Sequence, residues 1–201
     1  MARFSGLKGF VQLSTVEELR DKASKLLLLA RKHPKEADIL SSCASVVLAT
    51  ALDQGINDVL YSIAAQYANE NETLIDETPY EKNINDTFRN RMLDLPEVLS
   101  GGKFTLNKQS QYIKQINTLI SLRNRLMHII DDPEFFTESS EGVEIIGTKL
   151  FIKMEMPKSP WLTISSEEAY KYFEAVDIYF QEIIFPETGE IQEGKLVIPK
   201  R

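Results

Sequence analysis

The sequence predicts a mainly α-helical fold: an up-and-down bundle of four to five helices with a short β-hairpin inserted before the last helix. Apolar residues recur at helical spacing in five segments, proline and glycine separate these segments, and the spacing changes once to the alternation of strands. The 201 residues are expected to form a single domain. Within it, the helical core is predicted at about 14–132, the hairpin at about 143–156, the last helix at about 165–185 and a tail at 186–201.

The first helix is expected at 16–33, where apolar residues follow a helical period. Ser14 or Thr15 can cap its amino-terminal end, and two glutamates follow in the first turn. Pro34 then separates it from the next helix.

The second helix is expected at 35–69, a stretch without proline that is apolar around much of its circumference. This pattern predicts a central, largely buried helix, with the Cys43 thiol buried and inert inside it. Gly55 lies in the middle of the helix and costs about 1 kcal/mol there relative to alanine. It marks either the close approach of another backbone or a tolerated loss of helix propensity.

The remaining elements are predicted from the same two patterns, the helical spacing and the strand alternation of apolar residues. They are helices at 80–93, 107–130 and 165–184, a hairpin whose strands flank Gly147-Thr148, and a short strand at 195–198. Pro96 is expected to separate the third helix from the fourth, Pro133 to end the fourth, and Ser165 or Ser166 to cap the last. The tyrosines at 112, 170, 172 and 179 are expected in the core or at an interface.

The composition excludes several classes of protein. Of the residues, 43% are hydrophobic and 26% are charged, which is typical of a globular domain. The single cysteine excludes a disulfide within the chain, and the two histidines exclude a three-histidine zinc site. No phosphate-loop, dinucleotide-binding or α/β-hydrolase motif is present. We therefore expect a cytoplasmic protein that has no membrane segment and needs no metal or cofactor.

Charge is distributed unevenly along the chain. The formal net charge of −7 argues against a protein that coats nucleic acid with its whole surface. Residues 98–130, however, contain five lysines and arginines and no acidic residue, whereas 131–201 contain fifteen acidic residues and seven basic ones. A basic site is therefore expected in the middle of the chain.

The end of the fourth predicted helix, inside this basic segment, reads Arg123-Asn124-Arg125-Leu126-Met127-His128. With eight arginines, nine asparagines and two histidines, chance predicts the pattern R-N-x-x-x-H about 0.004 times in the chain. It resembles the signature of the HEPN family, many of whose members are metal-independent ribonucleases. The resemblance covers these six residues and the helical pattern that precedes them.

The residue types suit that chemistry. RNA can be cleaved without a metal when its 2′-hydroxyl attacks the adjacent phosphate, given proton transfer and cations that stabilise the phosphorane. His128 can exchange protons near neutrality, and Arg123 offers a planar fork of permanent charge to phosphate oxygens. We expect both to be catalytic and Arg125 to bind the flanking RNA backbone.

Helix geometry assigns supporting roles. Five residues correspond to about 140° of rotation, so Arg123 and His128 do not share a helix face, whereas Asn124 and His128 do. Asn124 is therefore expected to orient the imidazole. The HEPN resemblance implies a homodimer whose two motifs line one cleft, and an acidic residue on the preceding long helix directed at the motif. Asp53 stands at that place; it either pairs with Arg123 or His128, or faces solvent or another basic residue.

The leading hypothesis is an RNA endonuclease of HEPN type, acting as a toxin or defence effector, with RNA as substrate and an antitoxin as a candidate protein partner. The alternative is a non-catalytic module of similar fold that binds RNA or a nucleotide, or assembles with a protein. In a third interpretation the motif only ties two helices together, and its substitution lowers stability alone.

Overall fold

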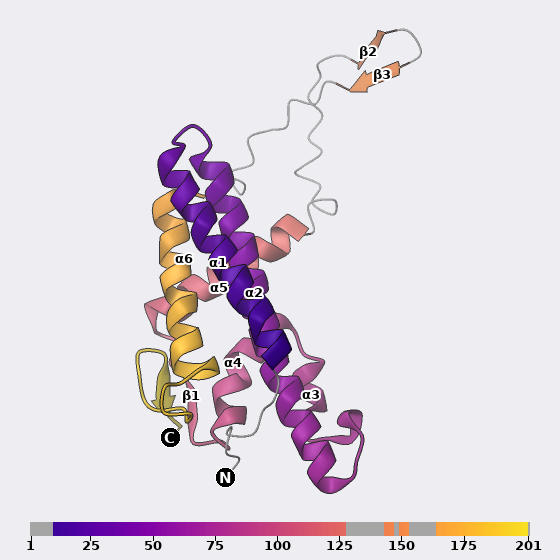
Figure 1. Ribbon diagram of the computed structural model, residues 1–201, viewed down its shortest axis with the longest axis vertical. Helices are drawn as coiled ribbons and strands as arrows, with labels where there is room; N and C mark the ends of the chain where they lie inside the picture. Colours follow the sequence, from indigo (N-terminus) through magenta and orange to yellow (C-terminus); the bar gives the residue numbers. More distant parts are fainter. Residues whose placement is uncertain (1–9, 128–142, 147–148, 153–163, 201) are drawn as a thin grey trace.

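The computed structural model describes residues 10–127, 143–146, 149–152 and 164–200, and the fold is mainly helical, as predicted. Figure 1 shows three long helices side by side: α1 (Phe10–Lys32), α2 (Ala37–Asn71) and α6 (Ser166–Tyr179). Helix α5 (Gln111–Met127) crosses obliquely behind them, and α4 (Phe88–Leu99) packs near one end. A bundle with a short hairpin before its last helix is therefore confirmed.

Helix α1 begins at Phe10, six residues before the predicted start. The expectation that Ser14 or Thr15 caps it was wrong, because both residues lie inside the helix. No proline or glycine stands between Phe10 and the end of the helix, so nothing in the sequence interrupts the helix at Ser14.

Helix α2 is the 35-residue centre of the bundle and contacts α1, α4, α5 and α6. It is long and apolar enough to cross a membrane, but 56% of its most apolar window is buried inside the fold, as in the core helix of a bundle. A Cβ at Gly55 would lie 2.8 Å from Cε1 of Phe180 and 3.2 Å from Cδ1 of Ile184. The close approach at Gly55 is thus made by side chains, not by another backbone.

Cys43 is exposed, so the prediction that it is buried was wrong. Its neighbours Ser42 and Ala44 are buried, and the core face of α2 continues through Leu48 and Leu52. Cys43 lies on the same outward stripe as Ile39, which is 67% exposed, because residues four apart share a helix face. The sequence is apolar on both sides of this helix, and only the packing of its neighbours decides which side is covered.

The third predicted helix is two helices in the structure. A 3-10 turn at Ile75–Glu77 precedes α3, which spans only Glu81–Ile84. The side chain of Thr87 then caps α4 by accepting a hydrogen bond from the backbone N–H of Asn90. Pro96 lies inside α4 instead of ending it.

The proline is accommodated by a partner from α6. Pro96 has no N–H to donate to the carbonyl of Met92, four residues earlier. The buried hydroxyl of Tyr179 donates to that carbonyl oxygen at 2.7 Å. The tertiary contact therefore replaces the backbone hydrogen bond that the proline removes.

Helix α5 starts four residues later than predicted, because Asn107 forms a turn in which its Oδ1 accepts from the N–H of Gln109. Before this turn, β1 (Phe104–Leu106) pairs antiparallel with β4 (Val197–Pro199). The strand expected at 195–198 therefore exists, displaced toward the carboxyl end, whereas its partner β1 was not predicted. The predicted end of the helix at 130 lies outside the described residues.

The predicted hairpin is present as β2 (Val143–Ile146) and β3 (Lys149–Ile152), which pair antiparallel. Its predicted turn at 147–148 and its continuation to 156 lie outside the described residues. Helix α6 is capped by Ser165, whose side chain accepts from the N–H of Glu168, as expected. It continues into the π-helix η4 (Phe180–Ile184).

The core runs between α2, α5 and α6. Tyr172 and Tyr179 are buried in the core. Tyr112 and Tyr170 are partly buried and pack against the core, as expected of core tyrosines. Glu182 of η4 fastens the tail, because its carboxylate accepts from backbone N–H groups on the approach to β4. The C-terminal strand is thereby held beside α4 and the start of α5.

Candidate functional site

A polar cluster joins α2, α4 and α5 around Asp53. Its Oδ1 accepts a hydrogen bond from Nη2 of Arg91 at 2.8 Å, and its Oδ2 lies 3.7 Å from Nη2 of Arg123. The exposed fractions of the three side chains are 17%, 16% and 29%. Both predicted alternatives for Asp53 are found in part: it contacts Arg123, and it also pairs with another basic residue, Arg91, to which its shorter contact is made. One carboxylate between two guanidinium groups leaves the cluster with a net positive charge.

Arg91 ties this cluster to the α3–α4 corner. Its Nη1 donates to the carbonyl oxygen of Ile84 at 3.2 Å, while its buried Nε has no hydrogen-bond partner within the described structure. Arg91 therefore holds one carboxylate oxygen of Asp53 while Arg123 lies nearest the other. The Nε–H group of Arg91 remains available as a hydrogen-bond donor.

Asn124 is exposed, and its Oδ1 accepts a hydrogen bond from Nη1 of Arg123 at 3.0 Å. Arg123 is thus held by a carboxylate on one side and by an amide on the other. The predicted role of Asn124 toward the imidazole concerns His128, and His128 lies outside the described residues. Its place in the sequence is one residue beyond Met127, the last described residue of α5.

A sequence signal for Arg91 was available, because the tripeptide Arg-Asn-Arg occurs at 89–91 as well as at 123–125. These two tripeptides contain four of the eight arginines in the chain. Residues two apart on a helix lie about 200° apart, so each tripeptide directs its arginines to opposite sides. Arg91 and Arg123 meet at Asp53, and Arg89 and Arg125 lie on another surface.

That other surface is a groove of about 510 Å³ between α4 and α5. Its charged lining residues are Arg89, Lys108 and Arg125. Nη2 of Arg89 donates to Oγ of Ser121 at 2.8 Å, which fixes this guanidinium against α5. Arg125, predicted to bind RNA, is thus brought together with two further cations instead of with Arg123.

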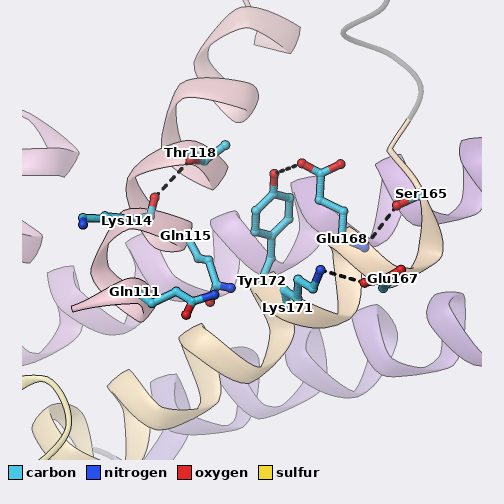
Figure 2. A pocket seen from close by; sticks show the side chains of 9 residues that line it. All are labelled: Gln111, Lys114, Gln115, Thr118, Ser165, Glu167, Glu168, Lys171 and Tyr172. Carbon is cyan, nitrogen blue, oxygen red and sulfur yellow. Dashed lines mark hydrogen bonds and ion pairs between the residues drawn. The ribbon is translucent and has the colours of Figure 1, made fainter. Parts of the chain in front are cut away.

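A second pocket, of about 420 Å³, lies between α5 and the amino-terminal end of α6 (Figure 2). Lys171 donates to Glu167 at 2.7 Å, and the Tyr172 hydroxyl donates to Glu168 at 2.7 Å. Burial, and then the bond to Glu168, raises the pKa of Tyr172 far above its usual value. Two lysines and two glutamates line this pocket, so it favours no ligand charge.

The part of the chain that the structure describes contains no group of three or more histidine, cysteine, aspartate or glutamate residues that could hold a metal ion. The chemistry that these residues offer is therefore that of arginines held by an aspartate and an asparagine, next to a basic groove.

Comparison with family models, with curated proteins and with solved structures found no match to this chain. The HEPN resemblance therefore rests on Arg123, Asn124 and His128 and on their helical context.

Proposed function

We propose that this chain is a metal-independent RNA endonuclease of HEPN type, in which Arg123 and His128 carry the reaction. The observation that carries the proposal is the contact between Asp53 on α2 and Arg123 on α5. An acidic residue on the long preceding helix, directed at the motif, is what the resemblance implies. The rarity of R-N-x-x-x-H in a chain of this composition supports it independently.

The reaction needs only the groups that this chain provides. The ribose 2′-oxygen attacks the adjacent phosphorus while the bond from phosphorus to the 5′-oxygen breaks. The 2′-hydroxyl loses its proton to a base and the leaving 5′-oxygen gains one, and imidazole can perform both transfers. Arg123 neutralises charge on the phosphorane oxygens. The products are a 2′,3′-cyclic phosphate and a 5′-hydroxyl.

Asp53 and Arg91 are positioning residues in this proposal. Asp53 limits the rotamers of the long Arg123 side chain, so less conformational entropy is lost when the phosphate binds. Arg91 shares the same carboxylate, so the cluster stays cationic and still attracts a phosphate.

The proposal is tested by incubating the protein with a mixed RNA pool in excess chelator. Wild-type protein should cleave the pool and leave cyclic-phosphate ends, and His128→Ala should abolish cleavage. The matched control is His33→Ala, which removes the only other histidine, exposed just after α1, and should leave activity unchanged. A substrate with 2′-deoxyribose at the cleaved position should resist, because it lacks the attacking hydroxyl.

A requirement for a divalent metal, or full activity of His128→Ala, would contradict the proposal. RNA that is bound but stays intact would favour the non-catalytic binding module. A lower melting temperature of Arg123→Ala without any effect on RNA would favour a purely structural motif.

The proposal includes a homodimer with a composite site, as the HEPN resemblance implies, and the rotation of about 140° between Arg123 and His128 is compatible with such a site. Mixed chains of Arg123→Ala and His128→Ala, each inactive alone, should then regain part of the activity. An active monomer in analytical ultracentrifugation would contradict this arrangement.

A further inference from the structure

We propose that the groove between α4 and α5 binds the phosphodiester backbone of single-stranded RNA next to Arg123. Its cations are Arg89, Lys108 and Arg125. That the polyanion is RNA rests on the proposed function, whereas the anion-binding character of the groove rests on its own residues.

The three cations come from three different segments. Arg89 is the second residue of α4, Lys108 lies in the turn between β1 and α5, and Arg125 is one helical turn beyond Ser121 on α5. No carboxylate is among the described residues that line the groove. Asp94 of α4 acts electrostatically on Lys108 but does not line the groove. Arg89 and Lys108 form no ion pair among the described residues, so a phosphate bound in the groove would compensate their charge.

Hydrogen bonds between α4 and α5 hold the two walls of the groove together. Arg89 donates to Ser121 at 2.8 Å and to the carbonyl oxygen of Asn117 at 3.4 Å, so a cation of α4 is fixed against α5. A volume of about 510 Å³ is typical of sites for small ligands. It has room for a short piece of one strand.

The assignment of the polyanion to RNA comes from the proposed function, because only ribose carries the 2′-hydroxyl that attacks the phosphate.

The groove is close to the proposed reaction centre. Arg123 and Arg125 are two residues apart on α5, a rise of about 3 Å along a helix about 10 Å wide. The two side chains leave α5 on opposite sides, so a strand in the groove reaches Arg123 by passing around the helix. In this arrangement, Arg123 meets the phosphate that reacts, and the groove holds its neighbours.

The test measures binding of a fluorescent single-stranded RNA, in excess chelator, at several salt concentrations. The protein carries His128→Ala throughout, so the RNA stays intact. Lys108→Gln and Arg89→Gln should each reduce the steepness of the plot of log affinity against log salt concentration by about 0.7. This corresponds to binding that is about fivefold weaker at 0.1 M salt. The matched control is Lys35→Gln, which removes one charge from the exposed turn between α1 and α2 and should change neither quantity.

In the catalytically intact chain, the groove variants should raise KM and leave kcat unchanged. Lys108 is exposed, so its substitution should not impair folding, whereas Arg89→Gln is checked by its melting temperature. Affinities and salt slopes equal to those of the Lys35→Gln control would overturn the groove proposal, whatever cleavage shows. Groove-dependent binding without any cleavage would refute the proposed function and leave the groove proposal standing.

Discussion

Replacement of Tyr179 by phenylalanine tests the hydrogen bond between α6 and the proline-containing helix α4. The Tyr179 hydroxyl is fully buried and donates to the carbonyl oxygen of Met92 at 2.7 Å. In an ordinary helix, that carbonyl would accept from the N–H of the residue at position 96. Because Pro96 has no N–H, the change leaves a buried carbonyl oxygen without this partner.

A buried carbonyl left without a partner costs about 1–3 kcal/mol. For a chain of this length, a loss of about 2 kcal/mol lowers the melting temperature by about 4–8 °C. The same change at Tyr61, which is 50% exposed, is the matched control and should have little effect.

A double-mutant cycle isolates the cause. Pro96→Ala restores an N–H that can donate to the carbonyl of Met92. The cost of Tyr179→Phe should therefore be smaller in the Pro96→Ala background, by about 1 kcal/mol. Urea unfolding followed by circular dichroism measures all four variants. Equal costs in the two backgrounds would refute the reasoning, as would a cost no larger than that of the Tyr61 control.

Three further changes probe other contacts. Gly55→Ala should lower stability by about 1–3 kcal/mol because the new Cβ would lie 2.8 Å from Phe180, and a higher melting temperature would mean that the ring moves aside easily. Glu182→Ala should speed hydrogen exchange of the β4 amides about tenfold relative to those of α1, because the segment leading into β4 loses two charge-assisted hydrogen bonds, and unchanged exchange would contradict the role of this carboxylate. Asp53→Asn should lower the free energy of unfolding at pH 7 by about 1–2 kcal/mol, because two arginines lose their shared charge. Asp58→Asn should not lower the free energy of unfolding. Burial raises the pKa of Asp58, so at a pH above the pKa of this group in the unfolded chain its charge already disfavours the folded state. Equal losses of stability at the two positions would contradict this distinction.

The distribution of charge agrees with the division of roles between the two arginine pairs. The chain as a whole is acidic, so its average field repels a polyanion. Arg89 and Arg125 line a groove in which the described lining residues include no carboxylate, whereas Arg91 and Arg123 share Asp53. Mutation of the groove should therefore affect mainly affinity and its salt dependence, and mutation of the Asp53 cluster mainly the reaction.

The sequence by itself determined the helical class, the existence of the long helices and the hairpin. These elements depend on local periodicity and on residues such as Ser165, whose capping role needs only the next turn of its own helix. The pairing of Asp53 with Arg123 was also expected as one of two alternatives, because a charge within an apolar helix needs a partner.

Only the tertiary structure decided the rest. Helix α4 tolerates Pro96 because Tyr179, 83 positions away, supplies a hydrogen bond that no local rule contains. Cys43 is exposed because no helix within the described residues covers its side of α2, although apolar residues occur on that side too. Arg89 and Lys108 join Arg125 through the packing of α4 against α5. Periodicity states which residues share a face, but which faces meet is decided by the packing of the whole chain.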